Sequence, residues 1–219
     1  MNNTLISLYE CRKLIGGLNP WLNLMIGAIG GWGLTRGMTY LSRPNIEMIV
    51  GGEAYLLQHT ANEIKFLHVK VINKTRNLFM RFLFGNPTLN NARAWISFID
   101  PVTKTEIFKI NGRWTTTKEP INYDTNKVDF ALAILPSREI IPAGEESEIS
   151  IAIKSINESS TYAFNNESYL HKWKKSDFEL IDNRYLIEVK VAADGNEWKK
   201  RFVLLNPGKS TANFKLIMQ

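Results

Sequence analysis

The chain has 219 residues, of which 44% are hydrophobic and 22% are charged, so its composition excludes wholesale disorder. It carries 27 Lys and Arg residues against 21 Asp and Glu, and the net charge of +6 suits an anionic partner without by itself indicating nucleic-acid binding. The single cysteine, Cys11, excludes an intramolecular disulfide and a cysteine-rich zinc site.

The first feature in chain order is an uncharged stretch, residues 14–35, with basic residues on both sides. A helix needs roughly 20 mainly apolar residues to cross a hydrocarbon core about 30 Å thick, and this stretch has that length. Trp21 and Trp32 would lie near its two ends, where aromatic side chains prefer the membrane interface. We therefore expect residues 1–43 to form an N-terminal segment whose apolar helix, at about 14–36, spans a membrane or lies on its surface.

Polar residues and glycines make this stretch a marginal membrane span, because Asn19, Pro20, Asn23 and six glycines interrupt it. Two other interpretations therefore stay open, a cleaved signal peptide and an element of a soluble fold. The glycines also form GxxxG spacings, which let two membrane helices approach closely. The candidate anchor or dimer face consists of Trp21, Gly27, Gly31, Trp32, Gly33 and Gly37.

After Pro44 the hydrophobic pattern changes to a period of two. The segments 66–73, 149–154 and 185–191 each alternate apolar and polar side chains, which is typical of half-buried antiparallel strands. About nine or ten strands are expected after residue 44, and no ten-residue segment there has helical periodicity. Short strands at this spacing predict an all-β, antiparallel β-sandwich over residues 44–219.

Turn signals separate the predicted strands. Asn111-Gly112 and Asp194-Gly195 each stand between two strand-like runs, and both dipeptides favour a tight hairpin turn because they tolerate positive φ. The polar, Asn- and Ser-rich stretch 155–168 predicts a long surface loop.

Several of these segments together carry a family resemblance: "SRPNIEMIV" after the uncharged stretch, then "HVKVINKT", "NARAWISFID", "INGRW" and the final "YLIEVKV…WKKRFVLLN". The chain resembles a loose class of archaeal and bacterial proteins in which a short N-terminal membrane segment carries an immunoglobulin-like, adhesion-type β-sandwich. The resemblance implies an immunoglobulin-like sandwich and a membrane-anchored location. It transfers no functional residue, because most members have no assigned activity.

One apolar run departs from the pattern of that class. "NLFMRFLF", at 77–84, stands where a short polar connection is expected. Apolar side chains on both faces favour a buried strand, whereas exposure of the run would mark a contact with a partner or a membrane. The candidate apolar contact loop consists of Leu78, Phe79, Met80, Phe82, Leu83 and Phe84.

Two short segments place a tryptophan beside clustered bases, "HKWKK" at 171–175 and "EWKKRF" at 197–202. Such clusters bind anionic lipid headgroups, acidic polysaccharides or nucleic-acid backbones. The more common arrangement is a strand whose tryptophan packs inward while its lysines project into water. The candidate anionic-surface contact consists of Lys172, Trp173, Lys174, Lys175, Trp198, Lys199 and Lys200.

Catalytic motifs are absent from the sequence. It has no glycine-rich phosphate loop and no serine nucleophile elbow, and His59, His68 and His171 lie far apart without the spacing of metal ligands. We therefore expect a protein that is not an enzyme, with no catalytic residue, cofactor or metal.

The leading functional hypothesis is a non-enzymatic, membrane-anchored sandwich that acts in binding or assembly. The N-terminal segment would contact the membrane, on a side that stays open because basic residues flank the uncharged stretch at both ends. A protein partner or a homo-oligomer fits this hypothesis, and nucleic acid is not expected. Two alternatives are a soluble or secreted sandwich that binds an anionic polymer or lipid surface through the Trp-Lys clusters, and a structural subunit of a surface or viral assembly.

Overall fold

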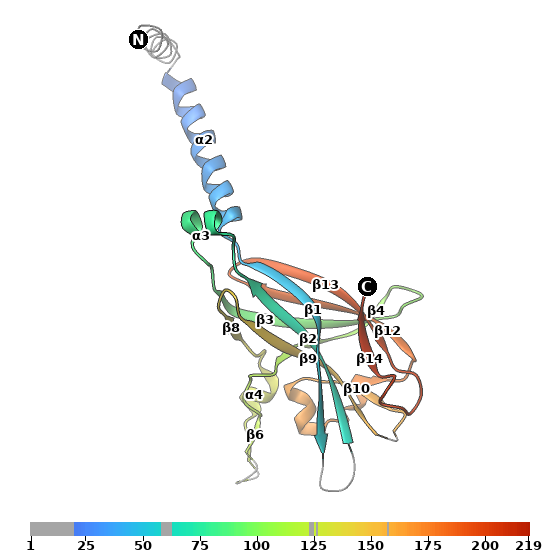
Figure 1. Ribbon diagram of the computed structural model, residues 1–219. Coiled ribbons are helices and arrows are strands. Elements are labelled where there is room, and N and C mark those ends of the chain that lie inside the picture. The colour runs from blue at the N-terminus through green and yellow to red at the C-terminus, as the bar shows by residue number, and fades with distance from the viewer. Residues whose placement is uncertain (1–19, 58–62, 123–124, 126, 157) are drawn as a thin grey trace. The chain divides into compact units, whose positions relative to one another are not determined.

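The computed structural model of the chain describes residues 20–57, 63–122, 125, 127–156 and 158–219 (Figure 1). The chain divides into two compact units, Met1–Arg43 and Pro44–Gln219, and each is described by itself.

The described part of the first unit is dominated by one helix, α2 (Pro20–Leu41). The helix continues five residues beyond the predicted end at 36, and residues 14–19 of the prediction lie outside the described part. Hydroxyls of Thr35 and Thr39 donate to backbone carbonyls four residues earlier, so these polar side chains are satisfied within the helix. Helix α2 ends just before Pro44, because a proline disfavours the helical conformation of the residue that precedes it.

Among the helices of the described residues, none combines the length and the apolar character needed to cross a membrane.

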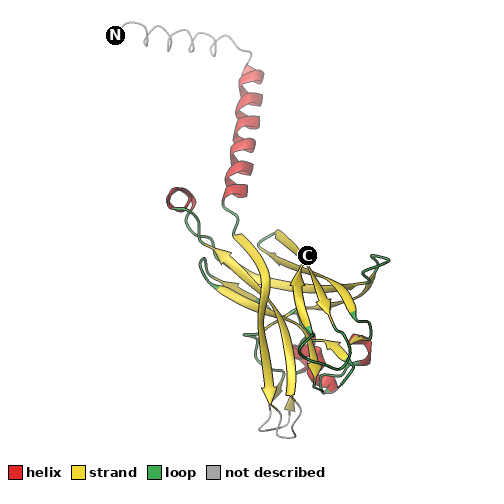
Figure 2. Ribbon diagram, turned by 45° about the vertical axis from the view of Figure 1, so that its right-hand side comes forward, coloured by secondary structure: helices red, strands yellow, loops and turns green. Residues whose placement is uncertain are grey.

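The second unit is a sandwich of two antiparallel sheets, as the period-two pattern predicts (Figure 2). The strands of the first sheet are β1 (Asn45–Leu57), β2 (Glu63–Lys74), β9 (Glu146–Ser155), β10 (Thr161–Ala163) and β11 (Glu179–Leu180), in that order, with β5 (Arg113–Trp114) beside β9. The strands of the second sheet are β14 (Lys215–Met218), β13 (Asn196–Leu205), β12 (Arg184–Ala193), β3 (Leu89–Ile99) and β4 (Glu106–Asn111), with β8 (Glu139–Ile141) beside β3.

Short elements connect these strands. Two of them, β6 (Ile121–Asn122) and β7 (Lys127–Val128), pair as a small hairpin of their own. The described helical elements of this unit are α3 (Leu78–Phe84), α4 (Phe130–Ile134) and the 3₁₀ helices η1 (Asn166–His171) and η2 (Ser176–Phe178).

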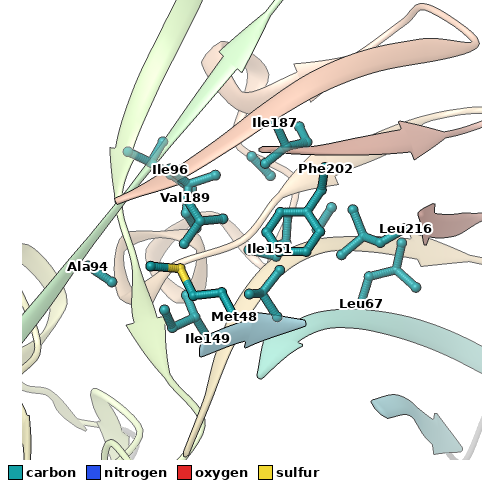
Figure 3. Packing of buried hydrophobic residues seen from close by; sticks show 14 of the residues in the cluster. Met48, Leu67, Ala94, Ile96, Ile149, Ile151, Ile187, Val189, Phe202 and Leu216 are labelled. Atoms are coloured by element: carbon teal, nitrogen blue, oxygen red, sulfur yellow. The ribbon is translucent and has the colours of Figure 1, made fainter. Parts of the chain in front are cut away.

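The main hydrophobic core lies between the two sheets (Figure 3). Leu67, Val69 and Val71 of β2 point into it, and so do Ile187 and Val189 of β12, all almost completely buried. Every second residue of a strand faces the same side, so the alternation read from the sequence places these side chains in one core. Burial of apolar side chains at this interface is the main source of the fold's stability.

One of the two predicted hairpin turns is confirmed. Asp194 and Gly195 both have positive φ, 50° and 75°, and they connect β12 to β13 through the pair Ala193–Asn196. This is the backbone conformation that the Asp-Gly dipeptide favours in a two-residue hairpin loop.

The hairpin predicted at Asn111-Gly112 is wrong, because the strands on either side of Gly112 belong to different sheets. Its backbone passes so close to β3 that an added Cβ would lie 2.6 Å from the Cβ of Ala94, and its N–H donates to the Ala94 carbonyl at 2.8 Å. The glycine thus permits a close crossing between the sheets rather than a tight turn.

The surface loop predicted at 155–168 is also wrong in large part. Strand β10 and the start of η1 lie within it, and Asn165, Asn166 and Ser168 are buried. The Asn165 side chain accepts a hydrogen bond from the Ser168 N–H, and the Ser168 hydroxyl oxygen accepts one from the Asn165 N–H. These polar side chains cap a helix, a role that the sequence composition alone hides.

Candidate functional site

The apolar run that follows β2 forms a short helix, so the predicted buried strand is wrong. The Asn77 side chain accepts a hydrogen bond from the Met80 N–H at 2.9 Å and caps the start of α3. Gly85, with φ of 66°, ends the helix and donates to the Arg81 carbonyl. Asparagine before a helix and glycine after it are the preferred capping residues, so the local sequence favours a helix here.

Helix α3 exposes four of its six apolar side chains. Leu78 and Phe82 are 84% and 87% exposed, Phe79 and Leu83 are more than half exposed, and no residue of α3 is buried. At 3.6 residues per turn these four side chains fall within an arc of about 140° on one face of the helix. The other two residues of the candidate contact loop, Met80 and Phe84, are half-buried.

Basic residues accompany this apolar face. Arg81 is exposed on α3, and the Arg76 guanidinium lies 5.9 Å from the centroid of the Phe84 ring and donates to the Phe84 and Gly85 carbonyls. The helix therefore combines an exposed apolar face with cationic groups, which is the composition of a membrane-interface contact.

Strand register places α3 at the end of the sandwich where the second unit begins (Figure 1). Asn45, the first residue of β1, pairs with Lys74, the last residue of β2. Pro44 and the start of α3 therefore lie at the same end of the first sheet, and the N-terminal unit is joined covalently to that end.

The candidate anchor or dimer face lies on α2. A Cβ added at any of its four glycines would meet nothing within 4 Å, and Trp32 is exposed. The Arg36 guanidinium lies 5.1 Å from the centroid of the Trp32 ring. Trp21 is part of the helix, and its side chain lies outside the described ones.

The first Trp-Lys cluster is largely neutralised by neighbouring acids. Lys174 pairs with Glu158 at 2.7 Å and Lys175 with Glu167 at 2.6 Å, while Lys172 is exposed. Trp173 is half-buried among aromatic rings, with ring centroids 5.8 to 6.2 Å away. Its neighbours in this aromatic cluster are Phe66, Phe164 and Tyr169.

The second Trp-Lys cluster lies on β13 of the second sheet, whereas the first follows η1 and packs against Phe66 of β2, in the first sheet, through Trp173. Trp198 packs against the main core, Lys199 is exposed and Lys200 is half-buried. Lys199 lies opposite Lys190, which pairs with Glu197.

A groove on the outer face of the first sheet was missed by sequence reasoning. Three strands contribute one row of polar residues, because Ser150 of β9 pairs with both His68 of β2 and Arg113 of β5. Beside this row lies a groove of about 290 Å³. Its lining includes Tyr55, Phe66, His68, Arg113, Glu119, Ser150, Phe164, Tyr169 and Trp173.

Two polar side chains of this groove, His68 and Arg113, are buried and incompletely paired. His68 and Arg113 are each only 6% exposed, and among the described residues neither the His68 Nδ1 nor the Arg113 Nε finds a hydrogen-bond partner. The Arg113 Nη1 and Nη2 donate to the carbonyls of Trp114 and Thr117 at 3.1 and 2.6 Å. Burial lowers the pKa of His68, the Glu148 carboxylate opposes that shift, and the Arg113 charge adds to it.

The groove could not be found from spacing along the chain. His68 and Arg113 are 45 positions apart, and only the register of β2, β9 and β5 brings them together. Among the described residues, no group of three His, Cys, Asp or Glu side chains is placed to hold a metal ion.

Comparisons with known proteins assign no family to this chain. No protein-family model matches it. No curated protein matches it either. A solved structure titled "X-ray structure of Northeast Structural Genomics Consortium target SoR45" is 11% identical and aligns over 74% of this chain and 87% of that one, with a TM-score of 0.31. At that level the match is a distant structural likeness that assigns no activity.

Proposed function

We propose that this protein is a non-enzymatic β-sandwich that docks on a membrane surface through α3 and the N-terminal segment, and that it acts there in binding or assembly. The exposed apolar face of α3 is the observation that carries the proposal. In this proposal the sandwich is held beside the bilayer, as in the membrane-anchored, immunoglobulin-like proteins that the sequence resembles.

The energetics favour a lipid contact at α3. Full burial of one Leu or Phe side chain is worth about 1.5–3 kcal/mol, so four partly inserted side chains supply several kcal/mol of membrane affinity. Each basic residue near an anionic surface adds about 1 kcal/mol, which Arg76 and Arg81 would contribute. The uncharged stretch before Arg36 precedes β1 in the chain and would supply further apolar residues for the membrane.

The alternative of an anionic-polymer site built from the Trp-Lys clusters has less support. Two lysines of the first cluster are already paired with glutamates. Each glutamate offsets the positive charge of its lysine, which leaves less net positive potential for an anionic polymer.

Vesicle partition tests the proposal with the full chain. The variant Phe79→Ser/Phe82→Ser removes two exposed rings of α3, and the matched control Val102→Ser/Ile181→Ser removes two side chains that are 86% and 83% exposed elsewhere on the sandwich. Loss of the two rings should weaken partition onto phosphatidylcholine–phosphatidylglycerol vesicles at least about tenfold.

The control variant should partition like the unmodified chain, since its substitutions lie away from α3. Pure phosphatidylcholine vesicles should bind less protein than the mixed vesicles, because they lack the negative surface charge that attracts Arg76 and Arg81. Equal partition of the α3 variant and the control would contradict the proposal.

A further inference from the structure

We propose that the groove on the outer face of the first sheet binds a small monocarboxylic acid with a flat, apolar body, with the carboxylate directed to Arg113 and His68. The site is independent of α3, so the failure of either proposal leaves the other standing.

The guanidinium of Arg113 supplies the anion preference. Arg113 is only 6% exposed, and within the described part of the chain no carboxylate oxygen lies within 4.0 Å of its guanidinium. A buried charge without an opposite charge is costly, and two carbonyl acceptors and the Tyr169 ring at 5.5 Å compensate it only in part. A bound carboxylate would complete that compensation.

The second polar group of the groove is His68, which comes from the neighbouring strand in the same row. Burial holds its pKa below the ordinary value, so at neutral pH it is an uncharged imidazole with one N–H donor and one acceptor nitrogen. Its Nδ1 and the Arg113 Nε are buried atoms of groove-lining residues, and neither atom has a hydrogen-bond partner in the part of the chain that the structure describes. Unpaired buried polar atoms are rare in folded proteins and mark places where a ligand or water completes the bonding.

Aromatic rings form the walls of the groove and select a flat, apolar body. Phe66 and Trp173 lie edge to face, as do Phe66 and Phe164, so the rings of the wall pack against one another. Tyr55 closes the side formed by β1 and is half-exposed. A volume of about 290 Å³ suits a ligand with one or two rings.

The rim of the groove favours a single negative charge. Glu119 lines the groove and is exposed, so its carboxylate repels a ligand with a second negative charge. This disfavours phosphate and dicarboxylates relative to a monocarboxylate.

Titration of the unmodified chain with phenylacetate, followed by nuclear magnetic resonance, tests the proposal. We expect saturable binding that perturbs the His68 ring signals. 2-Phenylethanol, which keeps the ring and lacks the charge, should bind at least about tenfold more weakly, and inorganic phosphate should not compete. This comparison uses one folded protein and needs no substitution.

Variants then assign the site. Arg113→Lys keeps the charge and loses the planar fork, and it should weaken phenylacetate binding at least about tenfold. Trp173→Leu removes part of the wall and should weaken it less, while Arg184→Gln, at an exposed arginine of β12, should have no effect. Equal binding of phenylacetate and 2-phenylethanol, competition by phosphate, or no saturable binding of phenylacetate would overturn the proposal.

Discussion

The two faces of strand β2 differ in their surroundings. On the inner face Leu67, Val69 and Val71 are sealed between the sheets, and their contacts are apolar. On the outer face Phe66 and His68 lie among aromatic side chains, and the His68 Nδ1 has no hydrogen-bond partner among the described residues. Alternate residues of β2 therefore serve the hydrophobic core on one face and line a surface with unpaired polar atoms on the other. Surfaces of the second kind are where binding sites form.

The largest expected effect is a difference in the free energy of unfolding lost by substitutions on the two sides of the first sheet. Phe202→Ala removes a fully buried ring from the inner core and should lower the free energy of unfolding by about 3–5 kcal/mol. Phe66→Ala, at a half-buried ring of the outer face, should cost about 1–2 kcal/mol. Urea denaturation of the two variants measures both values, and equal losses would erase the distinction between the faces.

A second prediction concerns the buried polar network between the sheets. Lys154 of β9 donates to the Asn206 side-chain oxygen at 2.6 Å and to the Gly208 carbonyl, and the Thr161 hydroxyl donates to the same Asn206 oxygen. Asn206→Ala would leave a buried ammonium and hydroxyl underpaired, and it should lower the free energy of unfolding by about 2–3 kcal/mol.

The control for this network is Asn90→Ala, because Asn90 is exposed and its side chain bonds only locally. It should change the free energy of unfolding by less than about 0.5 kcal/mol. A loss at Asn206 no larger than that of the control would show that the network does not stabilise the fold.

The residues of the inner face were predictable from sequence, because the alternation of apolar and polar residues within one strand shows which side chains face the core. The Asp194-Gly195 turn was predictable for the same reason. The role of Gly112 was not predictable, because the contact that excludes a Cβ there is with Ala94 of the neighbouring strand β3, which local sequence does not reveal.

Helix α3 and the groove at His68 and Arg113 also differ in how far the local sequence reveals them. The caps of α3, Asn77 and Gly85, are visible in the sequence, but the apolar composition between them outweighed these signals in favour of a buried strand. The pairing of His68 and Arg113 through Ser150 follows from strand register, which no local pattern encodes.

A smaller effect is the dependence of stability on pH, which arises at His68 on the outer face. The folded pKa of His68 is lowered, chiefly by burial, so the unfolded chain takes up a proton before the folded one does. The stability from uncharged His68 is therefore complete above the unfolded pKa of about 6.5 and is lost as the pH falls through the folded value.

Urea denaturation at pH 7.5 and at pH 5 measures this loss, with His68→Gln as the comparison. Glu148 and Arg113 are the charged groups that act on His68, and both are kept in the variant. The unmodified chain should lose more stability on acidification than the variant does, and equal losses would contradict a buried, uncharged histidine.

The smallest effect on stability is expected at α3. Phe82→Ser replaces a side chain that is 87% exposed, so the free energy of unfolding should change by less than about 0.5 kcal/mol. Urea denaturation in the absence of vesicles checks this, and a larger loss would mean that the ring supports the fold rather than a contact outside it.

The depth of α3 on a membrane is the measurement that tests the central claim most directly. A spin label at a cysteine introduced by Phe82→Cys, in a chain that also carries Cys11→Ser, reports collisions with oxygen, which concentrates in lipid, and with a water-soluble nickel chelate. On phosphatidylcholine–phosphatidylglycerol vesicles the label at 82 should show the lipid pattern, and a label introduced by Val102→Cys should stay aqueous. An aqueous pattern at both positions would contradict membrane docking through α3.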